Sequence, residues 1–442
     1  MWFACILWTC ITVAVFTADD PGPSAEVVYE WVSLDYDWPN DTTKVDYTAA
    51  RKYIKENNII AGVKVYKDDV YVTVPRWREG VPSSLNKVVM KNGKPILQPF
   101  PAWKSQTVGD CDALQYVQSM EVDPNRGWMW IIDVGRINTN PAKGSAPQNL
   151  CPAKLMIFDI NKHSFVKRYD FPATVVSPTT NFLNDIVVDY VDGRPRYAYI
   201  TDTSRDNPGL VVYDFYNNTS HRFTHVLAMT SETSAQNITI NNITYVINAP
   251  IDGIALSPDS KFLYFCPLAA YSLYQVSTAV VRDPLADFGA AVHKVGRKVA
   301  QTDGMAYGQN NLYFGVLSLN GVYKWEIGED AKVMQTYDKI EMKTQTPVVL
   351  DTVGMQWVDT FAFDQSGYLW FTANRLQPFF HGTLDFTDTA SSANMRIWKV
   401  FVGEKGYLDH SISASNSLFI SNTFLFVTVK LIFIYFLNIC VL

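Results

Sequence analysis

The stretch Asp252-Gly-Ile-Ala-Leu-Ser-Pro-Asp259, followed by Phe262-Leu-Tyr-Phe265, decides the fold because its form recurs along the chain. An acidic or amide residue precedes a strand-like run, a turn follows, and a second strand-like run comes after the turn. Two further copies are Asp303-Gly-Met-Ala-Tyr307 with Leu312-Tyr-Phe-Gly315, and Asp359-Thr-Phe-Ala-Phe-Asp364 with Tyr368-Leu-Trp-Phe-Thr372. This form indicates antiparallel strand pairs built on one repeating plan.

Six such stretches are present, and their spacing of roughly 50 to 65 residues is that of decorated four-stranded propeller blades. They begin near Gly62, Glu121, Asp185, Asp252, Asp303 and Asp359. The sequence therefore predicts an all-β fold, a six-bladed β-propeller with four-stranded antiparallel blades around a central channel. Because a propeller buries its core between blades, residues 27–410 are expected to form one domain.

Composition limits the classes of partner. The chain has 442 residues, of which 14% are aromatic and 18% charged, and its net charge is −6. The sequence pI of about 5.6 and the absence of long basic runs argue against a nucleic-acid partner. A mildly acidic protein more readily attracts cations, organic amines among them.

The N-terminus and the sequons predict a secreted, extracellular glycoprotein. Residues 1–18 read as a secretory signal peptide, because an apolar run ends at Thr17-Ala18 before two aspartates. A membrane anchor is the alternative for this segment. Five Asn-x-Ser/Thr sequons are candidate glycosylation sites, at Asn40, Asn217, Asn218, Asn237 and Asn242.

The cysteines fit the same compartment. Cys5 and Cys10 lie in the signal segment and Cys440 lies near the C-terminus. Cys111 and Cys151 flank the second repeat and its long loop, so we expect them to form a disulfide. Cys266 is left over and is expected to be a buried thiol.

The hydrophobic tail at residues 411–442 does not follow the propeller pattern. It could span a membrane, or serve as a lipid-anchor signal, or be a gene-model artefact. Lys430 in the middle of the apolar run weakens the two anchor readings, because a lysine at the bilayer centre costs roughly 3 kcal/mol. A membrane is therefore a partner only if this tail belongs to the mature protein.

An ordered set of longer motifs runs through the chain. They are Val74-Pro-Arg-Trp77, Leu97-Gln-Pro-Phe-Pro-Ala-Trp103, Met120-Glu-Val-Asp-Pro124, Trp130-Ile-Ile-Asp-Val-Gly-Arg136, Cys151-Pro-Ala-Lys-Leu155, Phe182-Leu-Asn-Asp-Ile-Val-Val-Asp189, Tyr199-Ile-Thr-Asp202 and Asn374-Arg-Leu-Gln377. With these motifs the chain resembles the yellow / major royal jelly protein family, from about Val27 to Leu408. The resemblance implies a secreted six-bladed propeller. Its members include pigmentation proteins, proteins credited with dopachrome conversion, salivary amine binders and nutritive glycoproteins.

Polar residues at the blade starts are the candidate site. The first residues of each innermost strand face a propeller's channel, and here they carry acids or amides: Glu121, Asn184, Asp185, Asp252, Asp303 and Asp359, with Asn374 nearby. We expect these residues to bind a small aromatic amine or a catechol-type ligand, whose ammonium would pair with a carboxylate. No cofactor is predicted, with a structural calcium ion in the channel as the alternative. The competing structural interpretation is that these side chains cap backbone N–H groups.

Aromatic residues near the blade starts would hold the ligand's ring, by stacking and cation–π contact. The candidates are Trp357, Phe361, Phe371 and Tyr307, which could equally be ordinary core between blades. The resemblance implies that the last blade contributes contacts to an amine, and motif matching places Thr360 and Asn374 there.

Two other functions stay open. A dopachrome-converting enzyme would need a base, and none of the six histidines stands at a blade start, so a channel carboxylate with a raised pKa would have to serve. No catalytic residue is assigned. A structural or nutritive glycoprotein would use the outer surface instead. We interpret Arg76-Trp-Arg-Glu79 as the cover of an outer sheet face.

Overall fold

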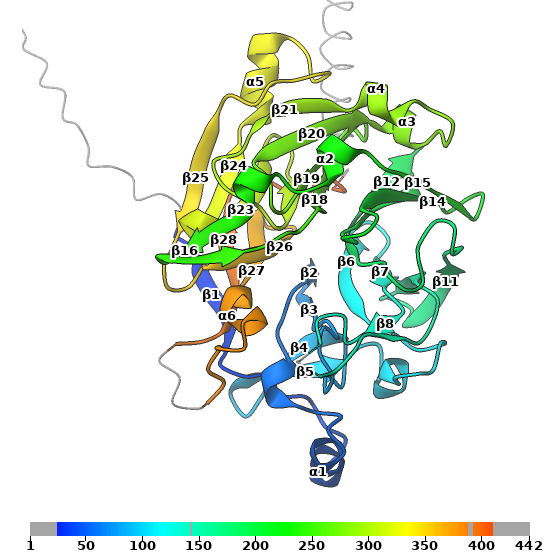
Figure 1. Cartoon of the computed structure of the whole chain (residues 1–442), viewed down its shortest axis with the longest axis vertical. Helices are drawn as coiled ribbons and strands as arrows, with labels where there is room; N and C mark the ends of the chain where they lie inside the picture. The colour runs from blue at the N-terminus through cyan, green and yellow to red at the C-terminus, as the bar shows by residue number, and fades with distance from the viewer. Residues whose placement is uncertain (1–23, 142–143, 388–391, 410–442) are drawn as a thin grey trace, which may run out of the picture.

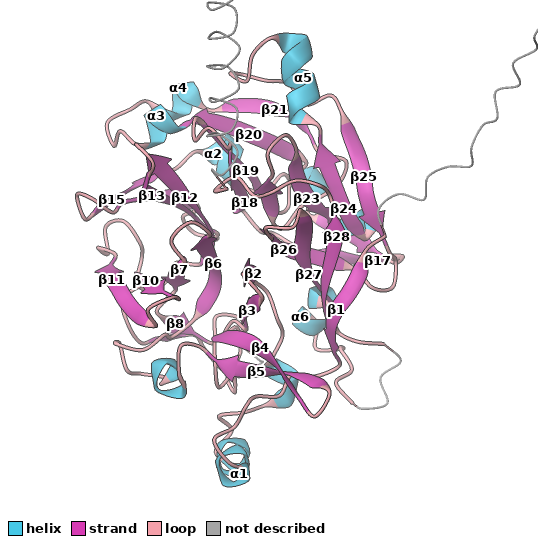
Figure 2. Ribbon diagram, turned by 180° about the vertical axis from the view of Figure 1, so that it is seen from behind, coloured by secondary structure: helices cyan, strands magenta, loops and turns pink. Residues whose placement is uncertain are grey.

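Six four-stranded antiparallel sheets stand around a central axis in the computed structural model, which describes residues 24–141, 144–387 and 392–409 (Figure 1; Figure 2). The predicted six-bladed propeller is therefore confirmed. The signal segment at 1–18, Cys5, Cys10, Cys440 and the tail at 411–442 lie outside the described residues.

The first three blades follow one another in the chain. Blade 1 consists of β2 (Val63–Tyr66), β3 (Asp69–Thr73), β4 (Leu85–Lys91) and β5 (Lys94–Pro99). Blade 2 consists of β6 (Val117–Asp123), β7 (Trp128–Asp133), β10 (Lys154–Asp159) and β11 (Ser164–Asp170). Blade 3 consists of β12 (Leu183–Val191), β13 (Arg194–Asp202), β14 (Gly209–Asp214) and β15 (Thr219–Phe223).

The last three blades repeat the plan. Blade 4 consists of β18 (Ile251–Leu256), β19 (Phe262–Pro267), β20 (Ser272–Ser277) and β21 (His293–Arg297). Blade 5 consists of β22 (Met305–Tyr307), β23 (Leu312–Val316), β24 (Gly321–Trp325) and β25 (Gln345–Leu350). Blade 6 consists of β26 (Trp357–Phe363), β27 (Tyr368–Asn374), β28 (Met395–Phe401) and β1 (Glu26–Trp31).

Blade 6 closes the ring with strands from both ends of the described chain. β1 pairs antiparallel with β28, from Glu26 opposite Lys399 to Trp31 opposite Met395. Figure 1 shows β1, in blue, beside the orange strands of the last blade. On the inside, β2 of blade 1 contacts β26 of blade 6, as each inner strand contacts the next. Backbone hydrogen bonds between distant segments thus hold the six blades in a closed ring.

The burial of each strand follows its place in the blade. The inner strands β6 and β18 are buried along their whole length, whereas the outermost strand β11 is largely exposed. Inner strands are covered on both faces by the neighbouring blades, so they read as apolar runs rather than as an alternation. This burial is why the repeats were recognisable in the sequence.

Short helices and two hairpins decorate the blades. The helices are α1 (Asp41–Ala49), α2 (Val226–Met229), α3 (Thr278–Val281), α4 (Phe288–Ala291), α5 (Ile327–Met334) and α6 (Leu376–Phe380). The 3₁₀ turns are η1 (Lys55–Asn57), η2 (Trp103–Gln106), η3 (Thr233–Ala235) and η4 (Leu317–Leu319). The hairpins are β8 (Arg136–Ile137) with β9 (Gln148–Asn149), and β16 (Asn237–Ile240) with β17 (Ile243–Val246). Within the described residues no helix is long and apolar enough to cross a membrane.

The cysteine prediction is confirmed. Cys111 and Cys151 form a disulfide with their Cα atoms 5.5 Å apart, and Cys266 is a buried free thiol on β19. All five sequon asparagines lie at exposed positions, which a glycan requires: Asn40, Asn217, Asn218, Asn237 and Asn242.

The interpretation of Arg76 as part of an outer sheet face is wrong. Arg76 is 2% exposed and its guanidinium donates to five backbone carbonyls, those of Val81, Pro82, Gln106, Leu114 and Gln115. Burial lowers the pKa of Arg76 to about 10. A planar guanidinium has five N–H donors, so it can satisfy several loop carbonyls at once where a backbone partner is missing. Arg76 therefore joins the loop within blade 1 to the segment that enters blade 2.

The Asp-Gly pairs of the repeats have a packing reason. A Cβ atom on Gly253 would lie 2.4 Å from the carbonyl oxygen of Asp303, and one on Gly304 would lie 1.9 Å from that of Asp359. The inner strand of one blade thus approaches the backbone of the next too closely for any side chain. Glycine at this position sets the spacing between blades 4, 5 and 6.

We expect the substitution Gly304→Ala to destabilise the fold by about 1–3 kcal/mol, because the new methyl group must push blades 5 and 6 apart. Gly289→Ala is the matched control, since Gly289 is exposed in α4 and its added Cβ would meet nothing closer than 3.5 Å. Chemical denaturation of both variants measures the difference. Equal stability of the two variants would contradict this account of blade spacing.

Candidate functional site

A β-bulge interrupts the inner strand of four blades. The pairing register shifts between Val117 and Met120 in β6, and between Leu183 and Ile186 in β12. It shifts likewise between residues 251 and 254 in β18 and between residues 358 and 361 in β26. A bulge leaves its extra residues outside the ladder and re-aims their side chains. The polar residues of the repeats stand at these bulges.

The bulges divide the predicted residues between two cavities at opposite ends of the channel. The first residues of the bulges, with Asp303 in blade 5, line one cavity: Gln118, Asn184, Asp252, Asp303 and Asp359. The second residues line the other, together with Glu121: Ser119, Asp185 and Thr360. The predicted set is therefore not one cluster. Glu121 lies two residues beyond the bulge of its strand, whereas Asp185 follows Asn184 within one bulge.

The cavity at the N-terminal ends of the inner strands, here called the mouth cavity, has a volume of about 580 Å³. Its inner wall carries the three carboxyl groups of Asp252, Asp303 and Asp359 and the two amides of Gln118 and Asn184. Its aromatic lining is Trp77, Phe182, Trp357 and Phe380, with His381. Arg136 and Arg205 also line it, and Arg136 is bonded to Asn149 and to the carbonyl of Asn181.

Hydrogen bonds link the polar groups of this wall. The Asn184 side-chain amide donates to Asp252 Oδ1 at 2.5 Å, and the Trp357 indole donates to Asp303 Oδ2 at 2.5 Å. Asp252 is also hydrogen-bonded to Asp303, and Thr360 donates to Asp359 at 3.1 Å. A carboxyl–carboxyl bond needs a proton, so Asp252 and Asp303 share one.

The carboxyl groups of the mouth cavity resist ionisation. Burial raises the pKa of Asp303 to about 6, although the Trp357 indole and Asp252 stabilise its charged form. Burial, and then the negative charges of Asp303 and Asp185, raise the pKa values of Asp252 and Asp359 well above the usual range. As the pH rises, Asp303 is thus the first of these three carboxyl groups to ionise. A bound cation would stabilise the ionised carboxylates, so the carboxyl groups of this wall would lose protons when the cation binds.

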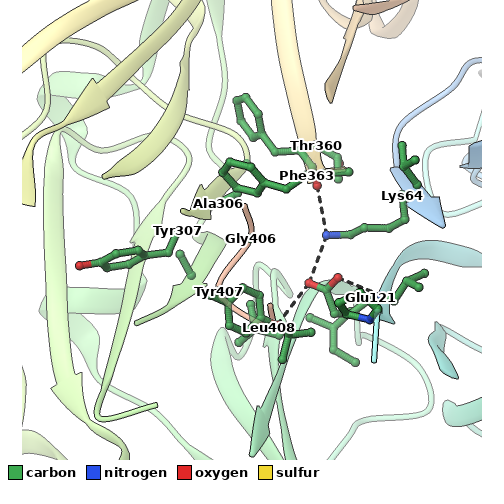
Figure 3. Close-up of a pocket in the computed structure, with 18 of the residues that line it drawn as sticks. Lys64, Glu121, Ala306, Tyr307, Thr360, Phe363, Gly406, Tyr407 and Leu408 are labelled. Carbon is green, nitrogen blue, oxygen red and sulfur yellow. Dashed lines mark hydrogen bonds and ion pairs between the residues drawn. The ribbon is translucent and has the colours of Figure 1, made fainter. Parts of the chain in front are cut away.

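The second cavity, here called the lysine cavity, lies at the C-terminal ends of the inner strands and has a volume of about 330 Å³ (Figure 3). The Lys64 ammonium extends into it from β2, 3.2 Å from Glu121 Oε2 and 3.1 Å from the carbonyl oxygen of Phe361. Glu121 also accepts from the Tyr407 hydroxyl at 3.3 Å and from the backbone N–H of Val122 at 2.9 Å.

The chain beyond β28 covers part of this end of the channel. Figure 3 shows Gly406, Tyr407 and Leu408 along one side of the lysine cavity, across from Lys64. Tyr407 donates to Glu121 of blade 2 and accepts from the backbone of Val188 in blade 3. Segments distant in sequence thus meet at the axis.

Asp185 also lines the lysine cavity. Burial, and then the charge of Asp303, raise its pKa to about 7, while the Lys64 ammonium opposes the shift. Because Asp303 lines the mouth cavity, the two ends of the channel are electrostatically coupled.

Asn374 lines neither cavity. Its side-chain amide donates to the carbonyl of Ile60 at 2.8 Å, and its Oδ1 accepts from the backbone N–H of Leu376 at 3.2 Å. Asn374 therefore ties blade 6 to the start of blade 1. Of the aromatic candidates, Trp357 lines the mouth cavity, whereas Phe371 packs in the core of blade 6 beside Trp398. Phe361 and Tyr307 line the lysine cavity.

Sequence reasoning missed Lys64, Gln118 and Tyr407. The second repeat begins at Gln118 rather than at Glu121, three residues further along, so a repeat placed at Glu121 leaves Gln118 out. Lys64 carried a usable signal, since it stands two residues after the repeat start at Gly62, as Glu121 follows Ser119. Tyr407 lies outside every repeat, and no local pattern places it at the channel.

Within the described ranges, no three His, Cys, Asp or Glu side chains are grouped in a way that could hold a metal ion. A structural calcium ion in the channel stays a prediction.

Comparison with known protein sequences matches this chain to a protein family. The sequence model of the family described as major royal jelly protein matches residues 116–404. The chain is 28% identical over 394 residues to Protein yellow of Drosophila yakuba, covering 84% of this chain and 67% of that protein. It is equally similar, by the same measures, to Protein yellow of Drosophila melanogaster.

Two solved structures align over most of the chain. A luciferin-regenerating enzyme aligns with a TM-score of 0.47 at 12% identity, over 87% of this chain and 97% of the enzyme. Regucalcin from Agrobacterium tumefaciens, described as a calcium-binding protein, aligns with a TM-score of 0.42 at 11% identity, over 80% and 95% of the two chains. At these values neither structure bears on the ligand of this chain.

We expect Asp252→Asn to become more stabilising, relative to the unchanged protein, as the pH rises from 5 to 8. A carboxyl whose pKa is raised by folding loses stability as the pH rises through the folded pKa. The asparagine keeps both hydrogen bonds without a charge, so we expect a gain on the order of 1 kcal/mol at pH 8. Thermal unfolding across this pH range measures it.

Asp330→Asn is the control of opposite sign. Bonds from Lys343, Trp325 and Thr344 hold the pKa of Asp330 below its usual value against its burial. Its contribution is present at neutral pH and is lost as the pH falls, so this variant should be the less stable one at pH 7. A pH-independent effect of Asp252→Asn would contradict the assignment of a shared proton.

Proposed function

This chain belongs to the major royal jelly protein family, and on that premise we propose that it is a secreted protein of pigment chemistry that binds a small aromatic amine or catechol-derived molecule in its mouth cavity. The observation that carries the proposal is the wall of three carboxyl groups and two amides facing a cavity of about 580 Å³. That volume falls within the range of about 300–1,000 Å³ typical of small-molecule sites.

The charge of the wall selects a cation. Asp252, Asp303 and Asp359 share one buried wall, whereas the arginine at 136 in the same lining is bonded to Asn149 and to the carbonyl of Asn181. An ammonium group placed there would stabilise the ionised forms of carboxyl groups that burial and mutual repulsion otherwise hold back from ionising. The cost of removing the ammonium from water is offset by the same contacts.

The lining of the mouth cavity suits an aromatic body. Trp77 and Phe380 lie edge to face with ring centroids 5.4 Å apart, and Trp357 stands beside Asp303. Gln377 adds a buried side-chain oxygen without a hydrogen-bond partner, which can accept from a ligand hydroxyl or N–H group. A ring carrying hydroxyl groups would satisfy both features.

Secretion is supported by the exposed sequons and the Cys111–Cys151 disulfide, since disulfides persist in oxidising compartments. The name of the yellow relatives suggests a role in colour. A nutritive or structural role is the alternative if the cavity binds neither amine nor catechol.

Turnover of a dopachrome-type molecule is a second candidate, because one observation favours it. The pKa of Asp303 near 6 is that of a general base that works close to neutral pH, and Asp252 and Trp357 are donors beside it. Binding and turnover would then use the same wall, and they differ in whether the ligand is consumed.

We expect the full chain to bind serotonin or dopamine with one site, and Asp303→Asn to weaken that binding at least about tenfold, because it removes the carboxylate that forms first. Calorimetric titration measures the affinity. Asp112→Asn, which removes a carboxylate whose side chain is 91% exposed, is the matched control and should leave amine binding unchanged.

Optical assay of dopachrome with the same preparations separates the two candidates. Amine binding without dopachrome loss supports a binding protein, whereas dopachrome loss that Asp303→Asn abolishes supports the enzyme. Silence in both assays, or equal effects of the two substitutions, would overturn the site proposal and leave the nutritive or structural role.

We further expect amine affinity to rise as the pH increases from 5 to 7.5. A bound ammonium favours ionised carboxyls, so protons held by the Asp252–Asp303 pair must leave on binding, and fewer remain at higher pH. The heat of binding should therefore vary with the ionisation enthalpy of the buffer. A heat that is the same in phosphate and in Tris would contradict the release of a proton.

A further inference from the structure

One ring of six equivalent positions forms the wall of the lysine cavity. In the four bulged strands this position lies two residues past the bulge, blades 1 and 5 have its counterpart without a bulge, and all six pair with an aromatic residue of the second strand. In chain order the ring consists of Lys64, Glu121, Val187, Ala255, Ala306 and Ala362. It thus holds one cation, one anion and four small apolar side chains.

The two charged members of the ring come from adjacent blades and contact each other. Their side chains are 14% and 9% exposed, so water screens the pair only weakly. A lysine ammonium has three N–H donors, and Glu121 and the Phe361 carbonyl accept two of them. One donor remains for a molecule in the cavity.

Negative charge lies on the other side of Glu121. Asp185 of blade 3 lines the same cavity next to Val187, and β12 of blade 3 contacts β6, which carries Glu121. A cationic group between Glu121 and Asp185 would have a carboxyl on each side. The cavity therefore offers a donor cation in blade 1 and acceptors in blades 2 and 3.

The ring positions of blades 3 to 6 are apolar, whereas the lining beyond the ring includes the polar residues Lys67, Asp364, Gln365 and Asp409. Ala255, Ala306 and Ala362 leave space on blades 4 to 6, and Phe363 and Leu408 border it (Figure 3). The volume of about 330 Å³ is at the lower end of the range for small-molecule sites, about 300–1,000 Å³. A ligand here is small, carries charges of both signs at one end and has an apolar body.

We propose that the lysine cavity binds a free α-amino acid with an apolar or aromatic side chain, the carboxylate on Lys64 and the ammonium between Glu121 and Asp185. A zwitterion is neutral overall, so it complements a wall that carries both signs of charge. The mouth cavity has three carboxyl groups on its inner wall, and no salt bridge joins them to the two arginines of the same lining, so this wall suits an amine that lacks the carboxylate. In the lysine cavity, by contrast, Lys64 is paired with Glu121 in the wall itself. The proposal holds whether or not the mouth cavity binds amines.

Fluorine NMR of 4-fluoro-L-phenylalanine with the full chain tests the proposal. We expect one site, from which L-phenylalanine displaces the probe. Phenethylamine lacks the carboxylate and 3-phenylpropionate lacks the ammonium, so each should displace it at least about tenfold less effectively. Serotonin should not displace it. This ligand series needs no variant and therefore does not depend on one that folds.

Variants locate the site. Lys64→Met would leave Glu121 buried without its cation, so the double variant Lys64→Met with Glu121→Gln is used to remove both charges together. It should lose probe binding, whereas the matched control Lys67→Met, an exposed lysine at the rim of the same cavity, should keep it. Circular dichroism confirms that both are folded.

Four results would overturn the proposal: no probe binding at millimolar concentration, full binding by the double variant, displacement by phenethylamine as effective as by L-phenylalanine, or displacement by serotonin. Loss of probe binding in Asp303→Asn but not in the double variant would instead place the amino acid in the mouth cavity. Failure of serotonin to bind anywhere bears on the mouth cavity alone.

Discussion

The antiparallel pairing of β1 with β28 is the constraint on which the rest of the structure depends. It joins residues 26–31 to residues 395–401, and so it fixes blade 6 against blade 1. Neither cavity has walls until the ring is closed, because each is lined by side chains from several blades. Asn374 strengthens the same joint by bonding to the carbonyl of Ile60.

The bulges of the inner strands turn a structural ring into two chemically different sites. In an unbroken strand, consecutive side chains would point to opposite faces of the blade and pack against the two neighbouring blades. The bulges instead aim one residue toward each end of the channel, as Asn184 and Asp185 show. In the mouth cavity, burial and then the negative charges of neighbouring aspartates raise the pKa values of Asp252 and Asp359. At the other end Lys64 neutralises Glu121, so that end has a different charge and suits a different ligand.

Stability and function compete at the channel. Burying several carboxyl groups in one wall costs folding energy, and a charge-free wall would be more stable. Apolar packing between the blades offsets this cost, and the glycines at 253 and 304 allow the blades to approach closely. The hydrogen bonds from Arg76 to five backbone carbonyls also stabilise the fold. A ligand of the right charge would recover part of it, which gives the channel a physical reason to bind one.

The sequence by itself determined the six-bladed propeller, the Cys111–Cys151 disulfide and the family, because repeats and motifs are local patterns that survive without coordinates. It also indicated a set of channel residues, of which Asp252, Asp303 and Asp359 share one cavity wall. Only the tertiary structure decided which of them meet. A bulge moves a side chain by one position and so changes the end of the channel to which it points, as with Asp185 and Thr360. Tyr407 bonds to Glu121, which is far away in the sequence, and Arg76 bonds to backbone carbonyls of a loop such as that of Leu114. These contacts form only in the folded chain, so no local sequence pattern reveals them.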